Sequence, residues 1–187
     1  MPSDYLEARG YHLHYGTLAQ MVELAGKLRS VNPAAQLLWE PNSHHFRGTG
    51  DEFQAVLSRV DLVSPDLEEA RQMTGQSTTD GMVKTLLGWG APTVALRMGA
   101  RGSLVASAGG EVYTVPAVPT TVVDTTGAGD AYCGGFLVAL GSGVDVTEAG
   151  ARAAVSASFA IEQFGVPMFD EQTCVEAERR LAWAKER

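Results

Sequence analysis

The feature that most constrains this chain is a short string, VVDTTGAGDA at residues 122–131, in which an apolar run breaks into small residues and closes on a carboxylate. A helical pattern begins where the string ends. Gly127, Ala128 and Gly129 leave their backbone N–H groups uncovered. A helix starting near Ala128 would therefore point its unpaired amides and its positive dipole end at an anion.

Asp130 falls in the first turn of that expected helix. A carboxylate beside a bound phosphate is electrostatically unfavourable, and its place there makes sense if it takes a proton from an attacking hydroxyl. The string therefore predicts phosphoryl transfer with Asp130 as the base. The residues alone leave a second interpretation open, because glycine-rich strand-to-helix turns with an acidic first turn are common in α/β proteins.

The longer string DTTGAGDAYCGGFL, residues 124–137, resembles the C-terminal signature of the ribokinase-like, or PfkB, family of carbohydrate kinases. The resemblance implies an α/β fold, ATP and Mg²⁺ as cofactors, and a small hydroxyl-bearing substrate such as a sugar or nucleoside. Asp130 matches the catalytic base of the family. Gly127, Ala128 and Gly129 match its anion hole, which stabilises charge on the transferred phosphoryl group.

Two residues of the loop before the helix match a further family feature. Asp124 and Thr126 occupy positions that help to hold a monovalent cation, such as K⁺, in family members activated by potassium. Backbone carbonyls near Ala160, Gln163 and Gly165 would complete that cation site. The alternative for Asp124 and Thr126 is a helix-entry turn in which they are capping side chains.

The segment SPDLEE, residues 64–69, follows an expected strand and resembles the Asn-x-x-Glu motif of the family. Glu69 matches the acidic residue that orders magnesium near the nucleotide phosphates. Asp66 stands where the family has Asn. The change removes an amide donor and adds negative charge, so it affects the expected phosphate affinity and metal dependence of this cofactor-binding position. The alternative is an acidic first turn of a helix without further function.

A third segment, VALRMGARGSLV at residues 94–105, resembles the family turn that borders the nucleotide. Gly99 and Gly102 suit a backbone that lies close to a ligand, and a plain turn is the alternative. Arg97 stands where the family often has a small polar residue. It either reaches a phosphate or only forms a surface ion pair.

Composition excludes several classes of function. The net charge of −8 argues against nucleic-acid or anionic-membrane partners, and no apolar stretch approaches the length of a membrane span. With two cysteines and no signal-like start, we expect a cytoplasmic protein without a disulfide framework. No P-loop string occurs, and Tyr132 stands where a dinucleotide fingerprint needs glycine.

The order of elements predicts an α/β fold with a mainly parallel sheet flanked by helices. The expected strands are Tyr11 to Tyr15, Gln36 to Glu40, Asp61 to Val63 and Thr93 to Met98, followed by an edge hairpin of Ser103 to Ser107 and Glu111 to Val118. The expected helices are Leu18 to Arg29, Glu52 to Ser58, Pro65 to Arg71, Asp80 to Leu87, Asp130 to Leu140, Thr147 to Gln163 and Asp170 to Lys185.

Against the family pattern, we expect residues 1–187 to be one partial ribokinase-like domain, the nucleotide-binding and catalytic half. The N-terminal strands and the lid are missing, which leaves an unpaired sheet edge and suggests a complementing chain or a homo-oligomer. A non-catalytic nucleotide-binding or assembly module is the alternative, and a scaffold that binds nothing is a third. Cys133 reads as a packing residue, and the pair His44-His45 as loop residues without a metal.

Overall fold

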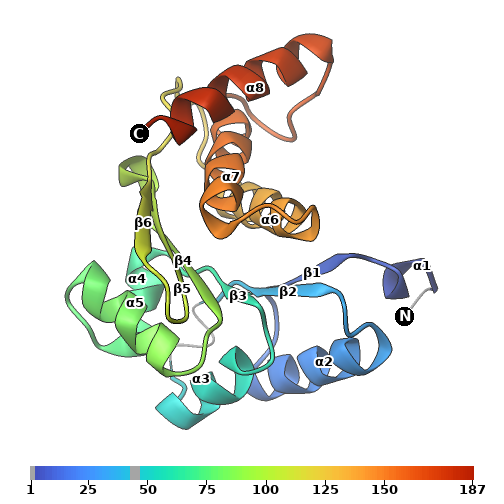
Figure 1. Cartoon of the computed structure of the whole chain (residues 1–187), viewed down its shortest axis with the longest axis vertical. Coiled ribbons are helices and arrows are strands. Elements are labelled where there is room, and N and C mark those ends of the chain that lie inside the picture. The colour runs from blue at the N-terminus through green and yellow to red at the C-terminus, as the bar shows by residue number, and fades with distance from the viewer. Residues whose placement is uncertain (1–2, 43–46) are drawn as a thin grey trace.

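The computed structural model describes residues 3–42 and 47–187, so His44 and His45 lie outside the described residues (Figure 1). Six strands form one sheet in the order β1-β2-β3-β4-β5-β6. The first four run parallel, and β5 and β6 are antiparallel to their neighbours. The strands are β1 (Gly10–Leu13), β2 (Gln36–Trp39), β3 (Leu62–Val63), β4 (Thr93–Arg97), β5 (Ser103–Ser107) and β6 (Val112–Val115).

Helices cover both faces of this sheet, as Figure 1 shows. Helices α2 to α5 alternate with the parallel strands along the sequence, and α6 to α8 come after the hairpin. The helices are α1 (Ser3–Leu6), α2 (Leu18–Val31), α3 (Gly50–Leu57), α4 (Leu67–Thr74), α5 (Thr79–Gly88), α6 (Ala128–Gly141), α7 (Val146–Ala160) and α8 (Glu171–Lys185), with a 3-10 turn, η1 (Gly99–Arg101), between β4 and β5. Within the described ranges, none of these helices has the length and apolar character that crossing a membrane requires.

The face of the sheet under α2, α3, α4 and α5 holds a core of large apolar side chains. Trp39, Phe53 and Met21 are almost completely buried there, together with leucines from β1, β2, β4, α2, α3 and α5. The Phe53 and Trp89 rings stack with their centroids 5.4 Å apart. Burying side chains of this size stabilises a fold by about 1.5–3 kcal/mol each, so this face supplies much of the stability.

The opposite face, under α6 and α7, is packed mainly with small side chains. Its core contains a run of buried alanines on α7, with Phe136 as its largest fully buried side chain. A Cβ at Gly135 on α6 would lie 2.8 Å from the Cβ of Ser156 and 3.2 Å from the Cα of Ala153. The two helices therefore approach closely because glycine and alanine leave room for them.

Most of the expected elements are confirmed, with shifts at their ends. The strand expected from Tyr11 to Tyr15 ends at Leu13, and the helix expected to reach Gln163 ends at Ala160. The helix expected to open at Pro65 begins at Leu67, because Asp66 has an extended backbone (φ −81°, ψ 176°) and caps it. The edge hairpin and the parallel pairing of β1 to β4 are as expected.

Candidate active site at the entry of helix α6

Helix α6 begins in a different way from its neighbours. Its N-cap is Gly127, in the left-handed region at φ 79°, and no side chain caps its first amides. In the described part of the chain, every other α-helix of eight or more residues has a threonine or aspartate side chain that accepts a hydrogen bond from a first-turn amide. Of its first-turn N–H groups, that of Ala128 donates to the Thr125 carbonyl at 3.2 Å, and those of Gly129 and Asp130 are left available for an anion.

A cleft of about 650 Å³ opens beside this helix entry. Six of the residues singled out from the sequence line it, and the Ser103 and Tyr132 hydroxyls, 2.7 Å apart, lie at its buried side. The other five lie outside the lining. The lining residues from the sequence analysis are Asp66, Arg97, Gly99, Gly102, Ala128 and Gly129, and those outside it are Glu69, Asp124, Thr126, Gly127 and Asp130.

Asp130 lies in the first turn of α6 and is exposed. Among the residues that the structure describes, its carboxylate makes no hydrogen bond or ion pair. A carboxylate without a partner at a helix entry is free to accept a proton from a ligand. Its role as a base stays a prediction.

Arg97 lies between the strand ends and the start of α6. Its Nη1 is 2.6 Å from Glu40 Oε1 and its Nη2 is 3.3 Å from Glu69 Oε2, and its side chain is only 14% exposed. A Cβ on Gly129 would meet Arg97 Nη1 at 2.1 Å. The guanidinium therefore packs directly against the glycine backbone of the expected anion hole, and position 129 has no room for a side chain.

The two carboxylates that hold Arg97 have opposite pKa shifts. Burial would raise the pKa of Glu40, but the hydrogen bond with His12 and the charge of Arg97 outweigh it and hold that pKa below its usual value. Burial raises the pKa of Glu69, and the backbone amide of Asp66 and the charge of Arg97 offset this only in part. Glu40 is thus the firmly ionised partner of Arg97.

Asp66 and Glu69 form a capping box at the start of α4. The Asp66 side chain accepts from the Glu69 amide at 2.8 Å, and Glu69 Oε2 accepts from the Asp66 amide at 2.7 Å. This is the helix-start arrangement that the sequence analysis kept as an alternative. It leaves lone pairs on both carboxylates, and the raised pKa of Glu69 marks a buried negative charge that a cation would stabilise.

The turn between β4 and β5 needs its glycines. Gly99 and Gly102 have φ values of 59° and 81°, and a Cβ on Gly102 would lie 2.0 Å from the carbonyl oxygen of Val115. The bare backbone of this turn forms one side of the cleft. A close approach of main chain to ligand, expected from the sequence, is geometrically open here.

The loop before α6 is fixed by local hydrogen bonds. The Asp124 side chain accepts from the Thr126 amide at 3.0 Å, a bond that lowers the pKa of Asp124. The amides of Val123 and Asp124 both donate to the carbonyl of Ile161, just after α7. This brings Asp124 beside the loop after Ala160, the neighbourhood that the expected cation site requires, although a turn-forming role accounts for Asp124 equally well.

Arg97 belongs to a row of polar residues at the strand ends, of which sequence reasoning missed His12 and Glu40. Side chains alternate along a strand, so His12, Glu40, Ser64 and Arg97 each lie two residues beyond a residue that faces α6 (Gly10, Leu38, Leu62 and Ala95). Glu40 joins the row through His12 Nε2, 2.8 Å from its Oε2. For Glu40, Ser64 and Arg97 the signal in the sequence was a polar residue directly after buried apolar residues, whereas His12 lies inside β1 and carries no such signal.

The sheet of four parallel strands with an antiparallel edge hairpin, and a cleft between the strand ends and an uncapped glycine helix entry, define an α/β protein of the ribokinase-like fold class. The profile of the pfkB family of carbohydrate kinases matches residues 14–172. The chain belongs to this family, and the resemblance stated from the sequence is confirmed.

Similar proteins include several kinases. A cytidine kinase of Thermococcus kodakarensis is 29% identical over 149 residues, which cover 79% of this chain and 53% of that protein. An uncharacterised sugar kinase of Archaeoglobus fulgidus is 33% identical over 146 residues, covering 74% and 57%. The chain thus spans little more than half the length of these relatives.

Solved structures confirm the fold. Arabidopsis thaliana ribokinase in complex with ribose and ATP matches with a TM-score of 0.77 and 23% identity, covering 95% of this chain and 59% of that one. A nucleoside kinase of the ribokinase family from Methanocaldococcus jannaschii matches with a TM-score of 0.74 and 19% identity, covering 94% and 56%. At these identities the likeness concerns the fold alone.

Proposed function

We propose that residues 1–187 are the nucleotide-binding and catalytic part of an ATP-dependent phosphotransferase, which phosphorylates a hydroxyl of a sugar or nucleoside-like acceptor. The observation that carries this proposal is the entry of α6. Its amides are uncapped, it opens on the cleft beside Arg97, and Asp130 stands exposed in its first turn. Membership of the pfkB family supports the same chemistry.

In this proposal the chain's own residues stabilise charge on the phosphoryl group and accept the proton of the acceptor. The amides of residues 127–129 receive the negative oxygens of the transferred phosphoryl group, and Asp130 takes the proton of the acceptor hydroxyl. The glycine turn at Gly99 and Gly102 lies along the nucleotide. Arg97, held by Glu40, supplies positive charge at the end of the cleft.

The residues also fit the cations that such chemistry uses. When bound, Mg²⁺ supplies charge screening for the nucleotide phosphates. Asp66 and Glu69 are the carboxylates that would hold it, because Asp66 lines the cleft and Glu69, joined to it in the capping box, carries a poorly solvated charge. Asp124 and Thr126, with the carbonyls after α7, would hold a monovalent cation. The ATP, Mg²⁺ and K⁺ assignments belong to this proposal.

The test is a coupled kinase assay of the purified chain across a panel of sugars and nucleosides. Asp130→Asn should lower kcat by about 10²- to 10⁴-fold, the usual contribution of a general base. Nucleotide affinity, measured by calorimetry, should change by less than about threefold, because the amides remain. The matched control is Asp80→Asn, which alters an exposed first-turn aspartate of α5. A variant at 130 as active as the parent would refute the assignment.

A second function is a nucleotide-binding or assembly module without catalysis. The observation that favours it is that Arg97 is committed to two carboxylates while the chain spans 53% and 57% of its relatives. Calorimetry separates the two functions. ATP binding without turnover on any acceptor supports the module, and absence of both binding and thermal stabilisation by nucleotide with Mg²⁺ supports a scaffold.

A further inference from the structure

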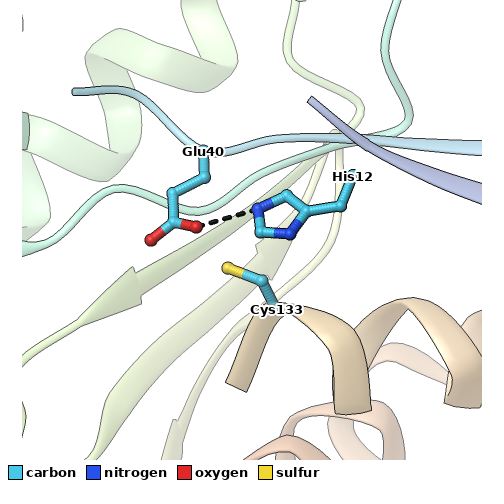
Figure 2. Close-up of side chains that lie close together, drawn as sticks. All are labelled: His12, Glu40 and Cys133. Atoms are coloured by element: carbon cyan, nitrogen blue, oxygen red, sulfur yellow. Dashed lines mark hydrogen bonds and ion pairs between the residues drawn. The ribbon is translucent and has the colours of Figure 1, made fainter. Parts of the chain in front are cut away.

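A group of three side chains, of which Glu40 and Cys133 are buried and His12 is partly exposed, lies under helix α6, outside the lining of the cleft. His12 comes from β1, Glu40 follows β2, and Cys133 lies in the second turn of α6. One nitrogen, one carboxylate oxygen and the sulfur lie within 4.8 Å of one another. Figure 2 shows the Cys133 thiol pointing toward the His12 ring and the Glu40 carboxylate.

We propose that His12, Glu40 and Cys133 form a binding site for a divalent transition metal of the Zn²⁺ type. Imidazole nitrogen, thiolate sulfur and carboxylate oxygen are the ligands that Zn²⁺ takes, with bonds of about 2.0–2.3 Å. Tetrahedral bonds of that length hold the ligand atoms about 3.3–3.8 Å apart. To close on an ion, the sulfur would move inward by about 1 Å, while His12 Nε2 and Glu40 Oε2, now 2.8 Å apart, would separate by about 0.5 Å.

Glu40 could bind a metal ion through one oxygen without losing the partner of the other. Its two oxygens have separate partners, since Oε1 pairs with Arg97 at 2.6 Å and Oε2 with His12 Nε2 at 2.8 Å. A metal ion would take the place of the proton between His12 and Oε2. The His12 ring would then carry its proton on Nδ1, and the Arg97 pair would stay intact.

Charge favours an added cation at this place. Glu40 and Glu69 bring two negative charges to Arg97, which brings one positive charge, and all three side chains are mostly buried. A divalent ion bound with the Cys133 thiolate would bring the net charge of this group to zero. Burial raises the pKa of the Cys133 thiol to about 12 in the metal-free protein, so the ion must displace the thiol proton.

His14 lies near the group as a candidate for the fourth position, and a route of entry is present. His14 Nδ1 lies 3.7 Å from Glu40 Oε2 and 3.1 Å from the Glu40 carbonyl oxygen. The side chains of His12 and His14 are 23% and 24% exposed, so an ion can reach the group from the β1 side of the sheet. With His14 or a water in the fourth position, the site would be closed from the nucleotide cleft by Arg97.

The experiment uses the full chain, stripped with a chelator and titrated with Co²⁺ and then Zn²⁺. We expect one Co²⁺ per chain, a thiolate-to-cobalt band in the near ultraviolet, and visible bands of tetrahedral intensity that Zn²⁺ abolishes. Cys133→Ser and His12→Ala should weaken binding by more than about 100-fold, the upper end for losing a mere supporting contact. His14→Ala should weaken it less.

Two controls keep the result decisive. The double variant His44→Ala with His45→Ala, and Cys174→Ser at an exposed position, should bind as the parent does. Circular dichroism of each variant in chelator shows whether it is folded. His12→Gln, which keeps a hydrogen-bonding group beside Glu40, serves if His12→Ala unfolds. Absence of the thiolate band, or binding that survives Cys133→Ser or is lost in the 44/45 variant, would overturn the proposal.

Discussion

The two faces of the sheet differ in the size of the side chains packed on them and in how their helices begin. Under α2, α3, α4 and α5 the core consists of large apolar side chains, and the helices start with side-chain caps. Under α6 and α7 the core is rich in alanine, α6 starts without a side-chain cap, and buried charges occupy the strand ends. The comparison teaches that one face stabilises the fold by burying large apolar side chains. The other face buries less apolar surface, and its small residues let backbone and charged side chains lie close together at the cleft.

The largest effect should come from the apolar face. Phe53→Ala removes a ring that is 1% exposed and stacks on Trp89, so the free energy of unfolding should fall by about 3–5 kcal/mol. Urea denaturation measures this. Well below the melting temperature, nucleotide affinity should not change. The control Val31→Ala, at an exposed site on α2, should stay within about 0.5 kcal/mol. A large loss of nucleotide affinity in Phe53→Ala would break the comparison.

The next effect tests the opposite face. In Gly129→Ala the new methyl group would collide with Arg97 Nη1 and displace it or the helix entry. Nucleotide affinity, measured by calorimetry, should fall by about 10- to 100-fold, or about 1.4–2.8 kcal/mol. Gly134→Ala is the matched control on the same helix, because a Cβ there meets nothing within 4 Å. Equal affinities for the two variants would contradict the role given to position 129.

A smaller effect, dependent on pH, concerns Glu40. Its folded-state pKa lies below the usual value of 4.5, so its ionised form stabilises the fold above that pH, and this is lost as the pH falls through the folded pKa. In chelator at pH 7, Glu40→Gln should lower the free energy of unfolding by about 1.5 kcal/mol. The gap between variant and parent should shrink below about pH 4.5. A gap that widens on acidification would reverse the assignment.

The smallest effect is a lost helix cap. Thr49→Ala removes the side chain that accepts from the Glu52 amide at the start of α3, which should cost about 1 kcal/mol of unfolding free energy. Thr49→Ser keeps the hydroxyl and should lose less than half as much. Neither variant should alter nucleotide binding, because α3 lies on the apolar face. An altered affinity would show that the two faces are coupled through the sheet.

Much of the fold could be predicted because its signals are local. Apolar runs alternating with amphipathic stretches indicated the parallel strands, and the closely spaced segments Ser103 to Ser107 and Glu111 to Val118 indicated the hairpin. The entry of α6 could be predicted equally well, since Gly127 and Gly129 carry no side chains at the positions where the helix begins. These features depend on neighbours in sequence and need no knowledge of long-range contacts.

The rest of the site depends on strand register. His12, Glu40 and Cys133 are separated by 28 residues and then by 93, and only the pairing of β1 with β2 and the crossing of α6 bring them together. Cys133 was correctly expected to be buried, but nothing near it in sequence pointed to a histidine at its side. The function of Asp66 and Glu69 stays open for the opposite reason, since a capping box and a metal ligand pair use the same residues.

Strand β1 has one consequence for how this protein meets other chains. It lies at the end of the sheet, so in the described part of the chain its outer amides and carbonyls pair with no strand. Any polypeptide that adds there would stiffen β1 and with it the ring of His12, while Gly10 holds the same strand against Leu137 of α6. Binding of a partner at this edge would thereby also restrict the motion of α6, the helix whose start opens on the cleft.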